Sequence, residues 1–193
     1  MTPLGQTELL EAPPTRRLIV PPGHGAIYGV DPGTQRLAIA VVTASGERRE
    51  RMISFARLQH AQRLASIFSA ASRLASELAE QAAPGLVVVE RPSGQHQNLP
   101  LLYAVGATTA GLYEGIVRVT GAPPHFDEVA PAQWKKVACG YGAIYKPKPP
   151  CEPEDYAVLR WAKTVGYEGT SFDVADSIGI SEYARKTFEL IER

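Results

Sequence analysis

Hydrophobic residues occur along the chain in two patterns: short apolar runs, which are typical of strands, and a repeat of about 3.6 residues, which is typical of helices. Apolar runs at residues 26–31 and 37–43 each end at turn residues, and a polar-edged run follows at 48–53. This pattern predicts three antiparallel strands joined by tight turns. The branched run at 86–90 is typical of a parallel strand buried on both faces. A short fifth strand is expected at 125–129.

The period changes to 3.6 residues at 57–81, where an apolar stripe predicts a long helix. Further helices are expected at 99–119, after Pro131, and in two closing segments, 154–165 and 172–191. The order of these elements predicts an α/β fold. Its mixed five-stranded sheet has three antiparallel strands and then two parallel ones, and helices flank it.

Two stretches of the chain show no period. Residues 1–25 are rich in Pro, Thr and Gly, which predicts a flexible N-terminal arm before one folded domain at 26–193. Residues 138–153 are rich in Gly and Pro and are expected to form a loop.

The composition excludes several classes of protein. The two cysteines have no Cys-x-x-Cys spacing, so they suggest neither a disulfide framework nor a zinc or redox motif. No apolar run approaches the roughly 18 residues of a membrane span, and the N-terminus lacks the apolar core of a signal peptide. We therefore expect a cytoplasmic protein without a membrane partner. Twenty basic residues balance twenty acidic ones, and this neutrality at first argues against nucleic-acid binding.

Four acids are candidates for chemistry because of their places in the pattern. Asp31 ends the first strand before a Pro-Gly turn, and Glu90 ends the buried strand at 86–90. If these two strands are parallel neighbours, both carboxylates emerge at the carboxyl edge of the sheet, where α/β folds place their sites. Asp173 and Asp176 lie three residues apart at the start of a helix, so they share a face.

Each acid alone has an ordinary explanation as a strand end or as part of the first turn of a helix. Together they would form an all-oxygen cluster without His or Cys, which is typical of a Mg²⁺ or Mn²⁺ site. Two such ions in one site activate water and stabilise the leaving oxygen in phosphodiester cleavage. The four residues therefore predict a two-metal hydrolytic site.

The same segments resemble the acidic motifs of RuvC-type Holliday junction resolvases, which have the RNase H-like fold. The matching segments are GVDPGT at 29–34, VVVE at 87–90 and DVADS at 173–177. The resemblance extends over residues 26–184 and includes Gly111 and the stretch 128–142. It implies an RNase H-like nuclease domain at 26–193, in an atypical or phage-type member of the family.

The resemblance also implies roles for basic residues. Lys135 and Lys146 match family lysines that lie near the scissile phosphate, although Lys136 leaves the register open by one residue. We predict that these two lysines are catalytic together with the four acids. Basic residues interleaved with aromatic ones can bind phosphates and stack on bases. The residues expected to contact nucleic acid are Lys135, Lys136, Tyr141, Tyr145, Lys146, Lys148 and Arg91.

The leading hypothesis is a metal-dependent endonuclease that resolves four-way DNA junctions by paired phosphodiester hydrolysis. It implies two Mg²⁺ or Mn²⁺ ions per active site, no nucleotide cofactor, and the cytoplasm of a bacterium or a phage-infected host cell. Symmetric cleavage needs two active sites, so a homodimer is implied, and the small-faced helix at 99–119 is the candidate interface. The chain departs from the family after Glu90, because no aromatic residue follows that could open the junction centre.

Three alternatives stay open. A YqgF-like nuclease of ribosomal RNA precursors has the same fold, but the lysine-rich region 135–148 favours the resolvase. A non-catalytic protein that binds branched DNA also has this fold, although the presence of all four acids argues against it. An ATPase of the actin and Hsp70 class shares a Gly-x-Asp-x-Gly-Thr loop but needs two such domains, which exceeds 193 residues.

The candidate acids change the meaning of the neutral charge. If bound cations neutralise these four acids, sixteen of the twenty acids remain against twenty basic residues. The rest of the chain is then net positive. Six lysines and arginines lie between residues 135 and 163, against three acids. The chain therefore predicts a basic rim around an acidic site, with an affinity for DNA that falls steeply with salt.

Overall fold

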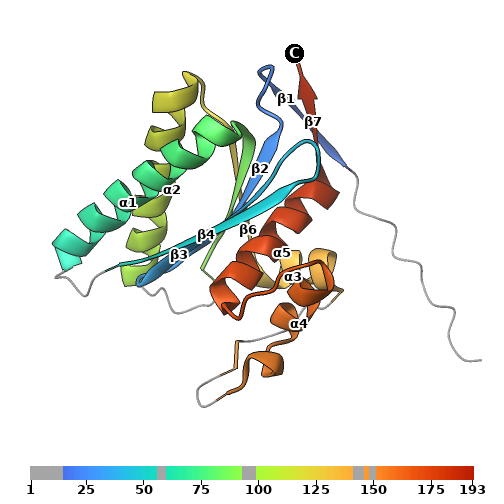
Figure 1. Cartoon of the computed structure of the whole chain (residues 1–193). Helices are drawn as coiled ribbons and strands as arrows, with labels where there is room; N and C mark the ends of the chain where they lie inside the picture. Colours follow the sequence, from blue (N-terminus) through green and yellow to red (C-terminus); the bar gives the residue numbers. More distant parts are fainter. Residues whose placement is uncertain (1–14, 56–59, 93–98, 141–145, 148–150) are drawn as a thin grey trace, which may run out of the picture.

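The computed structural model describes residues 15–55, 60–92, 99–140, 146–147 and 151–193 (Figure 1). Four strands come first, helices and strands then alternate, and a run of helices and a last strand follow. The strands are β1 (Arg16–Val20), β2 (Ala26–Pro32), β3 (Arg36–Val42), β4 (Arg48–Ser54), β5 (Pro84–Glu90), β6 (His125–Val129) and β7 (Phe188–Glu192). The helices are α1 (His60–Gln81), α2 (Leu99–Thr120), α3 (Pro131–Cys139), the short 3₁₀ helix η1 (Pro153–Asp155), α4 (Ala157–Thr164) and α5 (Phe172–Thr187). Among these described helices, none is long and apolar enough to cross a membrane.

The main sheet has the strand order β4-β3-β2-β5-β6. Its first three strands pair antiparallel, β5 pairs in parallel with β2, and β6 pairs in parallel with β5. This is the mixed five-stranded sheet that the sequence predicts. Tight turns are enough to join the antiparallel strands β2, β3 and β4. The parallel strands β5 and β6 each follow a long helix, α1 and α2 respectively.

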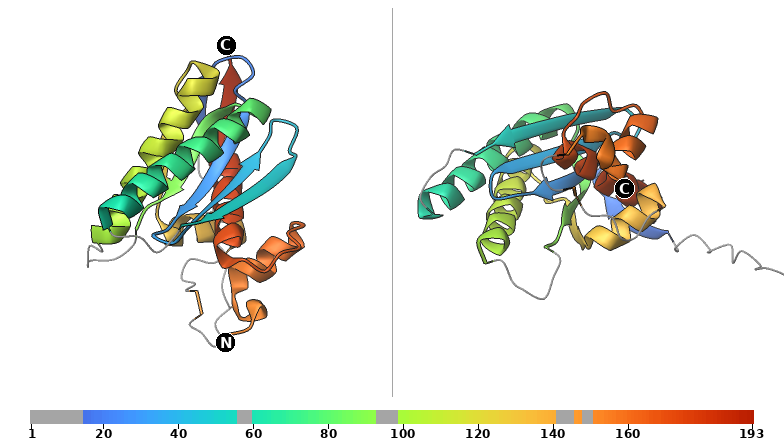
Figure 2. Two further views of the ribbon diagram at one scale, coloured as in Figure 1. Left: turned by 60° about the vertical axis from the view of Figure 1, so that its left-hand side comes forward. Right: turned by 90° about the horizontal axis from the view of Figure 1, so that it is seen from below.

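Helices cover both faces of the sheet (Figure 2). The helices α1 and α2 lie on one face, and α3, α4 and α5 lie on the other. Successive residues of β5 point to opposite faces. Val87 and Val89 therefore belong to the core under α1 and α2, while Leu86 and Val88 belong to the core under α5. The branched run of β5 is buried on both sides, as its composition predicts.

Gly29 allows α5 to approach β2 directly. A Cβ atom at this position would lie 2.3 Å from the backbone nitrogen of Ser181 and 2.4 Å from the carbonyl oxygen of Ser177. Any side chain here would therefore push α5 away from the sheet. The contact brings the first turns of α5, which contain two of the candidate acids, to the carboxyl end of β2.

Two terminal segments differ from the expectation. Residues 16–20, which the sequence assigns to a flexible arm, form β1, and β1 pairs in parallel with β7. The predicted helix at 172–191 ends at Thr187, and its last residues form β7 instead. Val20 is buried, and Arg16 forms an ion pair of 2.9 Å with Asp127 on β6. A local pattern cannot reveal this pairing because the two strands lie at opposite ends of the chain.

Candidate active site

Asp31 and Glu90 lie on neighbouring strands at the carboxyl edge of the sheet. In the parallel pair of β2 and β5, Val30 is opposite Val89, and each acid is the next residue of its strand. The predicted parallel pairing of these two strands is confirmed. Because the two strands pair in parallel, their carboxyl ends meet at one edge of the sheet and bring the two carboxylates together.

The first turns of α5 contribute Asp173 and Asp176. The helix begins after Ser171, whose hydroxyl accepts a hydrogen bond of 3.3 Å from the backbone N–H of Val174, an ordinary N-cap. The side chain of Asp176 is only 1% exposed, and that of Asp173 is 24% exposed. Asp176 is therefore the inner acid of the pair, and Asp173 is the outer one.

Lys146 joins three of the four acids. Its ammonium lies 3.1 Å from Oδ2 of Asp31, 2.8 Å from Oδ1 of Asp173 and 2.8 Å from Oδ2 of Asp176. The structure thus brings one of the two predicted catalytic lysines into the centre of the acidic cluster. A second cation, Arg36, lies 3.5 Å from Asp173 at the outer side.

Burial raises the pKa values of three carboxylates in the cluster. Burial, opposed by Lys146 and reinforced by Asp176 and Glu90, raises the pKa of Asp31 from 3.8 to about 8. Burial likewise raises the pKa of Glu90 and of Asp176 above their ordinary values. Burial alone would lower the pKa of Lys146, but Asp31, Asp176 and Asp173 outweigh it and raise that pKa, so its ammonium stays charged. The cluster therefore has a strong affinity for protons or cations.

The two neighbouring lysines of α3 lie in different surroundings. Lys135 is only 6% exposed, and its ammonium lies 5.1 Å from the ring centre of Trp134 and 5.8 Å from that of Tyr156. Its charge opposes the rise in the pKa of Glu90 and of Asp176, and the two rings beside it belong to side chains that donate hydrogen bonds to these acids. Lys136 is exposed on the outside of α3.

Two aromatic residues outside the predicted site contact the acids directly. The indole N–H of Trp134 donates to Oε2 of Glu90 at 2.6 Å, and the hydroxyl of Tyr156 donates to Oδ1 of Asp176 at 2.5 Å. Both side chains are fully buried. The sequence could have indicated them only by general chemistry, because a buried tryptophan or tyrosine usually requires a hydrogen-bond acceptor for its polar atom.

A cleft of about 480 Å³ opens over the cluster. Its lining includes Asp31, Glu90, Lys146 and Asp173, together with the turn after β2. Arg36, whose side chain is exposed, also lines the cleft. The only feature of the sequence that could have predicted a role for Arg36 is its place just after the turn that follows Asp31.

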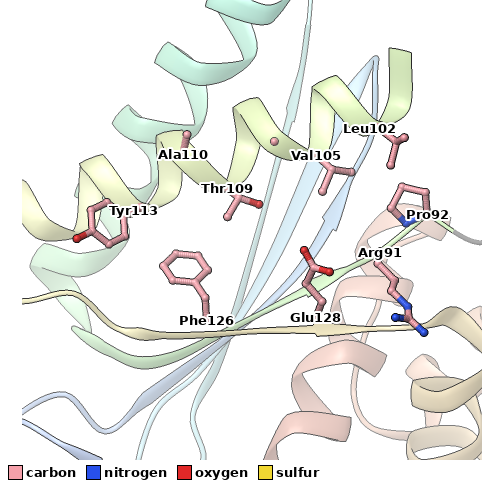
Figure 3. A pocket seen from close by; sticks show the side chains of 10 residues that line it. Arg91, Pro92, Leu102, Val105, Thr109, Ala110, Tyr113, Phe126 and Glu128 are labelled. Carbon is pink, nitrogen blue, oxygen red and sulfur yellow. The ribbon is translucent and has the colours of Figure 1, made fainter. Parts of the chain in front are cut away.

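Of the remaining predicted nucleic-acid contacts, Arg91 alone lies within the described residues. Tyr141, Tyr145 and Lys148 lie outside the described residues. Arg91 follows Glu90 in the chain, but its side chain lines a separate groove between α2 and β6 (Figure 3).

The donor set fits a divalent metal ion. All four acids offer hard oxygen ligands, and a positive group already lies among three of them. In the part of the chain that the structure describes, no three His, Cys, Asp or Glu side chains are arranged as ligands of one ion. The cation among the carboxylates is the Lys146 ammonium, so binding of a metal requires this side chain to move.

Comparison with solved structures identifies proteins of the same architecture. The structure of Thermus thermophilus RuvC matches with a TM-score of 0.60 and 19% identity, over 83% of this chain and 93% of that chain. A structure of T. thermophilus RuvC in complex with a Holliday junction substrate matches with a TM-score of 0.58 and 18% identity, over 84% of this chain and 94% of that chain. Comparison with models of protein families and with curated proteins gives no match. The chain therefore has the RNase H-like fold of the RuvC Holliday junction resolvases.

Proposed function

We propose that this protein is a metal-dependent endonuclease that resolves four-way DNA junctions by hydrolysis of phosphodiester bonds. One observation carries the proposal: Asp31, Glu90, Asp173 and Asp176 converge with two lysines at one edge of the sheet. They do so in a fold shared with a RuvC that was solved with a Holliday junction substrate. The fold alone would leave the activity open, and the convergence of these side chains supports it.

The four acids would hold two Mg²⁺ or Mn²⁺ ions, with Asp31 between Glu90 and the α5 pair. When bound, the ions supply an activated water and positive charge for the leaving oxygen. The carboxylates must be ionised to bind metal, so the raised pKa of Asp31, about 8, makes this step dependent on pH.

The two lysines have different tasks in this proposal. Lys146 has a half-exposed side chain, and it leaves the carboxylates to neutralise the scissile phosphate at the cleft. Lys135 is buried between two aromatic rings and stays in place, where its charge favours the ionised forms of Glu90 and Asp176. One lysine therefore acts on the substrate, and the other stabilises the charge of the site.

Paired cleavage requires a second active site, and we propose that it comes from a homodimer. The described residues include nine large apolar side chains that are exposed, and five of them lie on α2: Leu99, Leu102, Tyr103, Tyr113 and Val119. Beside them, the groove in Figure 3 is lined by Tyr113 and Phe126, whose ring centres are 6.2 Å apart. The small-residue face that the sequence suggested is used differently, because Gly111 and Gly115 pack on the backbone of α1.

The DNA would reach the cleft along its basic side. Arg36 at the rim and the exposed Lys136 are candidate phosphate contacts, and the predicted contacts of Tyr141, Tyr145, Lys148 and Arg91 stay part of this proposal. Phosphate contacts of this kind make binding sensitive to salt and position the DNA without reading its sequence. A cytoplasmic location also stays a prediction.

The test is cleavage of defined substrates. The protein is incubated with a labelled four-way junction, a replication fork, linear duplex DNA and structured RNA, each with Mg²⁺ or Mn²⁺. We expect symmetric nicks in the junction and loss of cleavage in Asp31→Asn. Asp127→Asn is the matched control, because this partly exposed acid pairs with Arg16 and lies outside the cluster.

The alternatives predict other outcomes. Cleavage of RNA alone would favour the YqgF-like nuclease. Tight binding of the junction without cleavage, by protein with all four acids intact, would favour the non-catalytic DNA-binding protein. Either result would refute the proposed resolvase.

A further inference from the structure

Two of the four acids are held by neutral, fully buried donors. Trp134 engages Oε2 of Glu90, and Tyr156 engages Oδ1 of Asp176. These contacts differ from those of Lys146, which is partly exposed and reaches across the cleft. A neutral donor fixes the direction of a carboxylate without competing for its charge, so both donors can stay in place when a cation arrives.

Trp134 is held in position by the packing of α3 on α5. Its six-membered ring lies over Gly179, where an added Cβ would come within 2.3 Å of the Cζ3 atom of Trp134. The glycine is one turn beyond Asp176 on α5, so the slot for the indole belongs to the same helix as the acid pair. The ring therefore has no room to shift, and its N–H points at Glu90.

Tyr156 is held in a similar way from the other side. It caps the start of α4, and its ring packs against Phe172 with ring centres 4.9 Å apart. Phe172 is the first residue of α5, next to Asp173. The hydroxyl thus reaches Asp176 from a fixed ring, and Figure 1 shows α3 and α4 close to α5.

Each donor occupies one oxygen of its carboxylate and leaves the other for a cation. The second oxygen of Asp176, Oδ2, is the one that Lys146 contacts at 2.8 Å. For Glu90, engagement of Oε2 leaves Oε1. A carboxylate held in this way coordinates through one oxygen, which suits the six-coordinate geometry of Mg²⁺. Ca²⁺ prefers more ligands and often takes both oxygens of a carboxylate.

We propose that Trp134 and Tyr156 are positioning residues that restrict Glu90 and Asp176 to single-oxygen coordination and so make the site select Mg²⁺ or Mn²⁺ over Ca²⁺. The inference rests on the proposed function, since it takes the four acids as the metal site. It goes beyond that function by assigning the choice of metal to two aromatic residues outside the ligand set. Hydrogen-bond partners of metal ligands typically change metal affinity by about 10- to 100-fold.

Metal binding tests the inference without recourse to cleavage. The dissociation constants of Mn²⁺ and of Ca²⁺ are measured by titration calorimetry on the full chain. Tyr156→Phe removes the hydroxyl but keeps the ring that packs on Phe172 and faces Lys135. Tyr28→Phe is the matched control, because Tyr28 is also fully buried and donates to a backbone oxygen at 2.8 Å, that of Ala82, before β5 begins.

We expect the wild type and Tyr28→Phe to bind Mn²⁺ more tightly than Ca²⁺. In Tyr156→Phe the preference for Mn²⁺ should fall by about tenfold or more, because Asp176 can then offer both oxygens to Ca²⁺. Trp134→Phe combined with Gly179→Ala tests the other donor, since the new methyl group fills part of the space that the indole leaves. The same loss of selectivity is expected there, and circular dichroism verifies that each variant is folded.

The outcomes separate the inference from the proposed function. If the wild type binds Mn²⁺ but Tyr156→Phe and the Trp134 variant keep the wild-type affinities for both metals, the positioning role is wrong and the metal site stands. If both metals lose affinity equally, the donors are merely structural and the selectivity inference is refuted. If the wild type binds neither metal, the metal-dependent function fails, and this inference fails with it.

Discussion

Replacing Lys146 by methionine removes the positive charge from the acidic cluster and keeps most of the side chain's length. In the metal-free protein, Asp31, Asp173 and Asp176 then face one another without the ammonium that lies within 3.1 Å of each. We expect Lys146→Met to destabilise the metal-free protein and to increase its affinity for Mg²⁺, because the lysine no longer competes for the carboxylates.

The size of the effect follows from the exposure of the groups. Removing one partner of a fully buried ion pair costs about 3–5 kcal/mol, and an exposed pair contributes about 0–1 kcal/mol. Lys146 is 39% exposed while Asp176 is 1% exposed, so the pair lies between these limits. We expect a loss of about 2 kcal/mol, which lowers Tm by roughly 4–8 °C in a domain of this size.

The assay is thermal unfolding followed by circular dichroism, in EDTA and again with Mg²⁺. Lys163→Met is a matched control, because Lys163 is also 39% exposed and pairs at 3.0 Å with Glu154, which is 63% exposed. We expect little change in that control. Equal shifts of Tm in the two variants, or no shift in EDTA, would refute the view that Lys146 neutralises the cluster.

Three further perturbations address the site, the fold and the assembly. The folded protein holds Asp31 at a pKa of about 8 against 3.8 for the free side chain, so this group's stabilisation is complete below about pH 4 and is lost as the pH rises to about 8. Metal-free protein should therefore lose thermal stability between pH 6 and 8.5, and Asp31→Asn should flatten that slope. Gly29→Ala should lower the unfolding free energy in urea by at least about 2 kcal/mol, whereas Gly106→Ala, with open space around its Cβ, should not. Leu102→Asp on the exposed face of α2 should yield monomers in analytical ultracentrifugation, and an unchanged dimer would contradict the proposed interface.

Local patterns predict the central part of the molecule well. The turn after Asp31 and the branched run before Glu90 are short-range signals, and they place both acids at strand ends, as the structure has them. The parallel pairing that brings the two acids together also follows from general rules, since a strand that returns after a long helix usually lies parallel to its neighbour.

Features that depend on distant partners are not predictable in this way. Trp134 is a fully buried core residue, but the acceptor for its N–H is decided by how α3 packs on α5. The same holds for Tyr156, whose acceptor lies 20 residues further along the chain. Gly111 and Gly106 look alike in sequence, yet only Gly111 meets α1, because the direction in which a helix faces is set by its neighbours.

The pairing of β1 with β7 has a kinetic consequence. Contacts such as that between Arg17 and Glu189 span 172 residues, so they close a very long loop and gain few buried side chains in return. We expect this two-strand unit to form last during folding and to open first, independently of the five-stranded sheet. Amide hydrogens of β1 and β7 should then exchange with solvent through local opening, while those of β2 and β5 exchange only when the whole domain unfolds. The pairing of β1 with β7 would thus open and close while the acidic cluster stays intact.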